Sequence, residues 1–232
     1  MLEVIQDQGL GARYDIYLPI HKGLRAFMCQ LRPRVGALDT EDEAAVTEAL
    51  EAVRALIVLC EGHLTKEDTL VHPYLEECAP GSAEGATAEH RDHAVSLEIL
   101  AAQADLVART RGTARVSAAL RLYRLLALMV GENFIHMHAE ETDHNAVLWG
   151  TRSDAELQGL EARIVATLTP AESAATLRWI VPALTPAERL EFLLPIRDNA
   201  PPVVLEEILS VVRPYLDGAA WSKLERGLRR AA

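Results

Sequence analysis

Histidine and glutamate side chains fall on faces of expected helices that otherwise carry apolar residues. His136 and Glu140, four residues apart, continue the face that carries Leu122, Leu126 and Met129. Burying an imidazole and a carboxylate on such a face costs several kcal/mol unless something pairs with them. A bound metal ion would provide that pairing, provided that other segments supply matching ligands.

Other segments supply such ligands. A second pair at the same spacing, His63 and Glu67, continues an apolar face, and single histidines extend the stripes of two further helices. Imidazole and carboxylate together suit iron, zinc or manganese, and the absence of thiolate from the set argues against a structural zinc finger. Two ions bridged by the glutamates, with an open position for a small exogenous ligand, would use the whole set. The predicted ligands are His21, His63, Glu67, His90, His93, His136 and Glu140.

Four long helices are expected to position these residues. They run from Asp15 to Gly36, from the capping box Thr40-Glu41-Asp42-Glu43 to an end or bend at Pro73, through the series His90 to Val107, and from Gly112-Thr113 to about Trp149. Short connections favour an all-α, up-down-up-down four-helix bundle. In such a bundle the starts of the odd helices and the ends of the even helices share one end. All the predicted ligands therefore converge on one layer.

The chain changes character after Trp149. Ser153 or Asp154 can cap a helix, and the tetrapeptide Thr-Pro-Ala-Glu then occurs at 169–172 and again at 185–188, each time as a helix start. Too few units follow for a solenoid, so the repeat indicates a reused capping signal. We expect a bundle domain at residues 1–150 and a C-terminal appendage of short helices at 151–232. The appendage would pack on the bundle or form a homo-oligomer.

Composition limits the class of partner. The 232 residues are half hydrophobic and a quarter charged, with a net charge of -11, which disfavours nucleic acid and anionic membranes as partners. The sequence has no basic-then-apolar leader and no apolar run long enough to cross a bilayer. Cys29, Cys60 and Cys78 form no CxxC pair and are interpreted as reduced thiols. A cytoplasmic protein that binds neither nucleic acid nor membrane is expected.

Several polar residues near the predicted ligands need an assignment. Glu132, Glu141 and His144 could hydrogen-bond to the ligands from outside, although a helix-end role is favoured for His144. His72, beside Pro73, is expected at a helix end and not as a ligand. His138, two residues after His136, should point towards solvent.

These residues, in this order and on these helices, resemble the hemerythrin family, specifically its HHE cation-binding branch. The resemblance covers about residues 10–150 and rests on His21 in Ile20-His21-Lys22-Gly23-Leu24-Arg25, on His63-x-x-x-Glu67, on His90, and on His136-x-x-x-Glu140 followed by a second glutamate. It implies a four-helix bundle with two non-haem iron ions and carboxylate and oxo or hydroxo bridges. Manganese or zinc are the alternative metals.

Two positions depart from the family pattern. Hemerythrins usually place two histidines four apart on the third helix, but this chain has Ala94 there, and its second histidine is His93. Oxygen-carrying hemerythrins have an aspartate five residues after the last histidine, where this chain has Glu141. Glu140, at four residues, is the preferred ligand. Both departures weigh against a reversible oxygen carrier.

The resemblance and the ligand set together suggest three functions. The favoured one is a di-iron protein that binds or senses O2, NO or a peroxide, with binding favoured over catalysis. The second is a di-iron enzyme of iron-sulfur cluster repair or of peroxide or NO reduction, although the chain lacks rubredoxin-type cysteine pairs for an internal electron relay. The third is a metal-responsive interaction protein that acts through its C-terminal helices.

Overall fold

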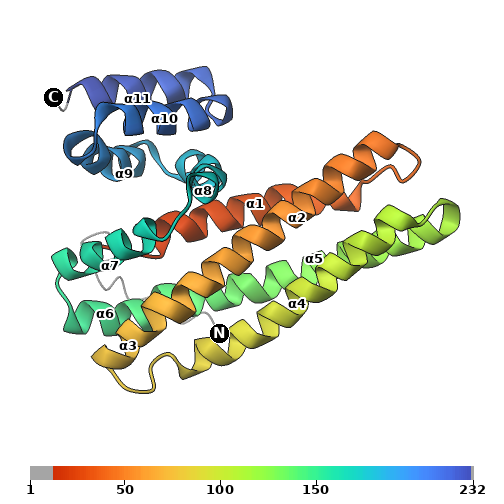
Figure 1. Cartoon of the computed structure of the whole chain (residues 1–232), viewed down its shortest axis with the longest axis horizontal. Coiled ribbons are helices and arrows are strands. Elements are labelled where there is room, and N and C mark those ends of the chain that lie inside the picture. Colours follow the sequence, from red (N-terminus) through yellow and green to blue (C-terminus); the bar gives the residue numbers. More distant parts are fainter. Residues whose placement is uncertain (1–12, 231–232) are drawn as a thin grey trace, which may run out of the picture.

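Four long helices lie side by side in the structure, a computed structural model that describes residues 13–230 (Figure 1). They are α1 (Leu18–Gly36), α2 (Glu43–Lys66), α4 (Glu84–Arg109) and α5 (Gly112–Ala139). Every regular element within this range is helical, which confirms the predicted all-α bundle. Residues 1–12 of the predicted first domain lie outside the described range.

Two of the long helices continue beyond a wide turn. α2 passes through the π-helical turn η1 (Glu67–Val71) into α3 (His72–Cys78), and α5 passes through η2 (Glu140–His144) into α6 (Asn145–Thr151). The expected end or bend at Pro73 is therefore replaced by a helix that continues to Cys78. Pro73 lies in the first turn of α3, where a proline is tolerated because its nitrogen need not donate a hydrogen bond.

The bundle core consists of one apolar stripe from each long helix. Met28, Leu56, Leu100 and Leu122 are all fully buried in one cluster, which also contains Cys60. Removing these side chains from water is the main stabilising contribution to the bundle. The same stripes, continued towards one end of the bundle, bring the predicted ligands into the interior.

The start of α2 differs from the prediction. Asp42, not Thr40, caps the helix, and its carboxylate accepts hydrogen bonds from the backbone N–H groups of Ala44 and Ala45. Glu43 cannot reach back as a capping-box partner because the buried guanidinium of Arg115 binds its carboxylate at 2.7 Å. The predicted box at Thr40 is therefore wrong.

The predicted helix caps after the bundle are confirmed, with Ser153 and not Asp154 as the cap of α7 (Asp154–Ala166). Thr169 and Thr185 of the two Thr-Pro-Ala-Glu segments cap α8 (Pro170–Ala183) and α9 (Pro186–Asn199), and the glutamate of each segment accepts a hydrogen bond from the backbone N–H of its capping threonine. The chain then forms α10 (Pro202–Val212), the 3-10 turn η3 (Arg213–Tyr215) and α11 (Gly218–Arg230).

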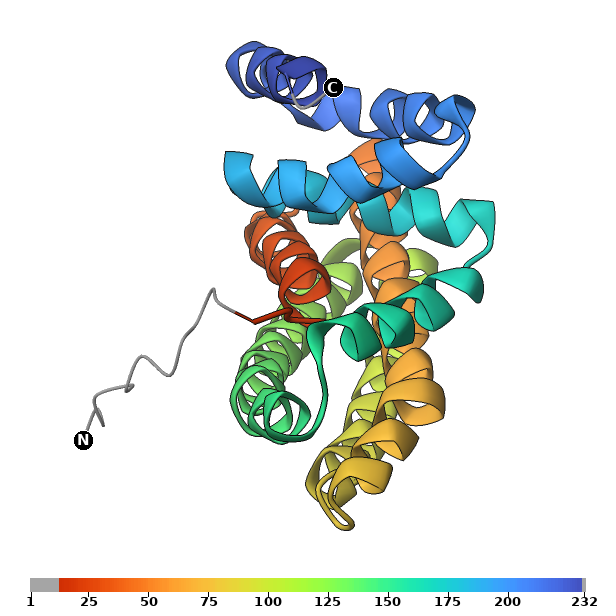
Figure 2. The same cartoon turned by 90° about the vertical axis from the view of Figure 1, so that its left-hand side faces the viewer.

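The C-terminal helices cover one side of the bundle (Figure 2). α8 lies across α1, with the Trp179 ring stacked on Phe27 at 4.0 Å between centroids. The two backbones approach so closely at Gly23 that a Cβ there would lie 3.0 Å from the Ile180 nitrogen. α9 to α11 share a separate apolar cluster with α8, whereas α7 packs against α3 and α6 through Leu157 and Leu160.

The division of the chain into two domains at residue 150 remains a prediction. Within residues 13–230, none of the helices is long and apolar enough to span a bilayer.

Candidate metal centre

Six of the seven predicted ligands meet at one end of the bundle, where α1 and α4 begin and α2 and α5 end (Figure 1). Each long helix contributes a histidine, and the two glutamates are the first residues of the π turns η1 and η2. All except the partly exposed His63 are at most 3 % exposed. The residues are His21, His63, Glu67, His90, His136 and Glu140.

The six residues form two overlapping groups of four. One group holds His21 and His63, the other holds His90 and His136, and both share Glu67 and Glu140, with the potential ligand atoms of each group within 4.8 Å of one another.

Each carboxylate faces histidines of both groups. Glu67 lies 3.3 Å from His63 Nε2 through one oxygen and 3.6 Å from His90 Nε2 through the other. Glu140 Oε2 lies 3.4 Å from His136 Nε2 and 3.5 Å from His21 Nε2. This is the arrangement that two ions bridged by two carboxylates would need.

Carboxylates outside the cluster orient three of its histidines. Nδ1 of His21 lies 3.0 Å from Glu141, Nδ1 of His90 lies 2.7 Å from Asp68, and Nδ1 of His136 lies 2.7 Å from Glu89. A carboxylate at Nδ1 holds the proton there, so that the Nε2 lone pair points into the cluster.

These outer carboxylates were only partly foreseen from the sequence. Glu141 was predicted in this role, and it also pairs with Arg25. Asp68 and Glu89 were missed because each lies next to one predicted ligand but contacts a histidine on another helix. Only the packing of the helices reveals such contacts.

Buried polar atoms without a hydrogen-bond partner indicate whether the cluster can hold a cation. Nε2 of His21 and His63 and both carboxylate oxygens of Glu67 and Glu140 are buried, with no hydrogen-bond partner among the described residues. Leaving each such group buried without a partner lowers the free energy of unfolding by about 1–3 kcal/mol. Nε2 of His90 and of His136 lie only 3.0 Å apart, the separation expected for two nitrogens bound at a right angle about 2.1 Å from one ion. The donor set therefore fits metal cations.

Burial shifts the pKa of every cluster residue towards the neutral form. It lowers the pKa of His136 to about 2 and holds the pKa of His21 and His63 below the ordinary value. It raises the pKa of Glu67 and Glu140, and the charge of Glu140 adds to the shift of Glu67. The imidazoles are thus ready to bind a cation, whereas the carboxyls must first release protons.

His93 does not join either group of four. It is 5 % exposed, its ring centroid lies 4.8 Å from that of His136, and its Nδ1 has no hydrogen-bond partner within residues 13–230. A residue three positions after His90 lies about 60° round the helix from it. Position 94 would not serve instead, because Ala94 is exposed. Ligation by His93 remains a prediction.

The remaining polar residues lie as follows. His138 is exposed as expected, and Glu132 is half-buried, with its charge acting on His93. His144 is buried inside the continuous η2–α6 helix, which corrects the favoured helix-end role, and its Nδ1 lies 3.0 Å from the hydroxyl of Tyr17.

His72 is also buried, and although it is the first residue of α3 it lies at the junction with η1, inside a longer helical segment. The π turn explains its position, because the N–H of His72 donates to the carbonyl of Glu67 five residues earlier and so sets His72 one turn after that ligand. A sequence pattern based on α-helical spacing cannot detect this shift.

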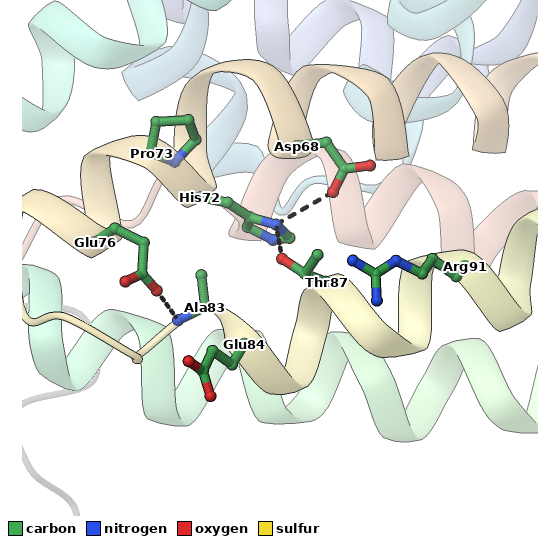
Figure 3. A pocket seen from close by; sticks show the side chains of 8 residues that line it. All are labelled: Asp68, His72, Pro73, Glu76, Ala83, Glu84, Thr87 and Arg91. Carbon is green, nitrogen blue, oxygen red and sulfur yellow. Dashed lines mark hydrogen bonds and ion pairs between the residues drawn. The ribbon is translucent and has the colours of Figure 1, made fainter.

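Two clefts reach this end of the bundle. One of about 210 Å³ is lined by Glu89, His136, Glu140 and His144, so that two residues of the cluster contribute to its wall. The other, of about 460 Å³, is lined by Asp68, His72 and Thr87 among others (Figure 3).

Comparison with known proteins gives one match. The family model described as "Hemerythrin HHE cation binding domain" matches residues 13–148, which is more than half of the chain and includes the whole cluster. No curated protein and no solved structure matches.

Proposed function

The chain belongs to the hemerythrin HHE cation-binding family, and on that premise we propose that it is a non-haem di-iron protein that binds or senses O2, NO or a peroxide. The observation that carries the proposal is the pair of four-residue groups that share both glutamates. Iron suits imidazole and carboxylate ligands, and manganese or zinc are the alternatives. Oxo or hydroxo bridges would accompany the carboxylates.

The chain's own residues have distinct tasks in this proposal. His21, His63, His90 and His136 would hold the ions, and Glu67 and Glu140 would bind between them and neutralise charge. Once bound, iron would supply a change of oxidation state and an open position for the exogenous ligand. The cleft of about 210 Å³ beside Glu140 is large enough to admit a diatomic molecule or a peroxide. Such binding could serve sensing, storage or detoxification.

A second candidate function is a metal-responsive interaction protein. The capping glutamates of the two Thr-Pro-Ala-Glu segments reach lysines that adjoin predicted ligands. Glu188 binds Lys22, next to His21, at 2.6 Å, and Glu172 lies 3.3 Å from Lys66, next to Glu67. Metal binding could therefore be transmitted to the C-terminal helices and to a partner or second copy bound there.

Metal content tests the main proposal. The full-length protein, expressed in iron-supplemented medium, should contain about two irons per chain by elemental analysis. His63→Ala and His136→Ala should lose most of this iron. His138→Ala is the matched control, because His138 is exposed on the same helix as His136, and it should retain the iron. An iron-free wild-type protein, together with unchanged variants, would contradict the proposal.

Ligand experiments separate binding from catalysis. The anaerobic ferrous protein should bind NO tightly and stoichiometrically, as followed by its absorption spectrum. Steady consumption of NO or peroxide with an added reductant would instead favour the enzyme alternative.

A further inference from the structure

Two buried histidines, His72 and His144, have no part in the function proposed above. They are 4 % and 6 % exposed, come from α3 and η2, and have ring centroids 5.8 Å apart. Together with Glu140 they form a further group whose potential ligand atoms lie within 4.8 Å of one another. Two buried imidazoles and a carboxylate at this separation are a donor set for a cation.

His72 presents a free nitrogen to this group. Its Nδ1 lies 3.2 Å from the carboxylate of Asp68 and 3.1 Å from the hydroxyl of Thr87. Its Nε2 is buried and has no hydrogen-bond partner in the described part of the chain. With the proton held at Nδ1, the Nε2 lone pair is left for a ligand, as for the histidines of the main cluster.

His144 is oriented in a similar way. Its Nδ1 lies 3.0 Å from the hydroxyl oxygen of Tyr17, a residue only 2 % exposed. When Nδ1 donates its proton to that oxygen, Nε2 of His144 presents a lone pair.

The two π turns place these histidines in similar positions. Glu67 begins η1 and His72 directly follows that turn, whereas Glu140 begins η2 and His144 is its last residue. π turns inside α-helices occur frequently at functional sites. Each of the two π turns thus brings one additional histidine to the end of the bundle that holds the cluster.

We propose that His72, His144 and Glu140 form a third cation position beside the two-ion centre, suited to a divalent transition-metal ion. The proposal rests on the metal-binding function proposed above. A carboxylate offers about four lone-pair sites, so Glu140 can contact this cation while it bridges the other two. Imidazole ligands favour zinc, iron, nickel or copper over magnesium and calcium.

A cleft of about 460 Å³ reaches His72 from the side of its Nδ1 (Figure 3), and the cleft of about 210 Å³ is lined by His144 and Glu140. His72 lies there between Asp68 on η1 and Thr87 on α4, and the side chain of Asp68 is 45 % exposed. Asp68 contacts Nδ1 of both His72 and His90. Arg91 also lines the cleft, so selection of the cation rests on the imidazoles and not on a uniformly acidic opening.

The number of bound ions tests the proposal. The full-length protein, stripped with a chelator, is titrated anaerobically with Co²⁺, and bound metal per chain is measured by equilibrium dialysis and elemental analysis. The wild-type protein should bind three ions. His72→Ala, His72→Gln and His144→Ala should each bind two, and the control His138→Ala should bind three. Circular dichroism verifies that each variant keeps its helical content, and the three independent variants protect the test against one that fails to fold.

The outcomes separate this proposal from the main one. Two ions in the wild-type protein, or three in folded variants of both His72 and His144, would overturn the third position and leave the two-ion centre intact. One ion or none in the wild-type protein would overturn the two-ion centre itself.

Discussion

Glu140 is shared by three groups of potential metal ligands. It belongs to both four-residue groups and to the third group with His72, and it is only 1 % exposed. Its buried oxygens have no hydrogen-bond partner within residues 13–230, and burial raises its pKa. In the metal-free protein the carboxyl is therefore held in its protonated form, and a cation must displace that proton.

Replacing Glu140 with glutamine should weaken metal binding without disrupting the fold of the metal-free protein. Glu140→Gln keeps the shape of the protonated carboxyl, so metal affinity should fall more than about 100-fold while the metal-free fold survives. Because the folded pKa lies above the ordinary value of 4.5, the carboxyl's contribution to stability is complete below that pH and is lost as the pH rises. The metal-free variant should thus match the wild type at pH 4 and be at least as stable at pH 8, as measured by thermal unfolding. A less stable variant at pH 8 would contradict the raised pKa.

The apparent metal affinity should rise with pH. The pKa of Glu67 and Glu140 is raised, so protons compete with the cation above pH 4.5, whereas the lowered pKa of the histidines, about 2 for His136, removes them from competition near neutrality. Each displaced proton increases the affinity about tenfold per pH unit. Competition titrations with a chelator from pH 5.5 to 8 measure this slope, and Glu140→Gln should reduce it. A single step near pH 6.5 would instead indicate histidines with ordinary pKa values.

Two features of the helices position the site. The π turns η1 and η2 begin at Glu67 and Glu140 and rotate the following residues towards the cluster. On the opposite face of α1, close packing against α8 fixes the helix that carries His21. Gly23 makes that close approach possible because it has no side chain to separate the two backbones.

Adding a methyl group at Gly23 should loosen α8. Gly23→Ala should destabilise the protein by about 1–3 kcal/mol through overpacking, offset in part by the roughly 1 kcal/mol that alanine contributes in a helix. Gly131→Ala is the matched control, since nothing lies within 4 Å of the added Cβ, and it should stabilise α5 by about 0.5–1 kcal/mol. Thermal unfolding compares the two variants. Equal stabilisation of both variants would show that α8 does not pack closely against α1 at Gly23.

For the whole molecule, the metal centre and the C-terminal helices are linked to the same long helices. The cluster joins α1, α2, α4 and α5, and the ion pairs Lys22–Glu188 and Lys66–Glu172 join α1 and α2 to α9 and α8. Bound metal should therefore stabilise the long helices and the C-terminal helices joined to them, and not only the residues that bind it.

Removal of metal should lower the unfolding temperature. A free metal concentration of about 100 times Kd stabilises the folded state by about 2.7 kcal/mol, which for a chain of this size corresponds to roughly 5–10 °C. Calorimetry of the chelator-treated and reloaded protein measures the difference, which should shrink in His63→Ala because the two-ion centre loses a ligand. An undiminished difference in that variant would place the stabilising ion elsewhere.

The helical bundle and most of the cluster could be predicted from the sequence. Apolar residues at helical spacing define which face of each helix is buried, and His21, His63, Glu67, His90, His136 and Glu140 lie on those faces. Antiparallel packing then brings them to one end, whatever the details of the contacts. The capping boxes at Ser153, Thr169 and Thr185 were equally predictable, because each is a local hydrogen-bond pattern.

The neighbours that complete the site depend on how the helices pack in three dimensions. Asp68 and Glu89 orient histidines on other helices, so their role depends on how the helices pack. His72 and His144 enter the interior because the π turns depart from α-helical periodicity, which a spacing rule assumes to be constant. The cap of α2 moved from Thr40 to Asp42 because Arg115, distant in the sequence, binds Glu43. In each case the deciding interaction is not local in the sequence or breaks the regular helical repeat.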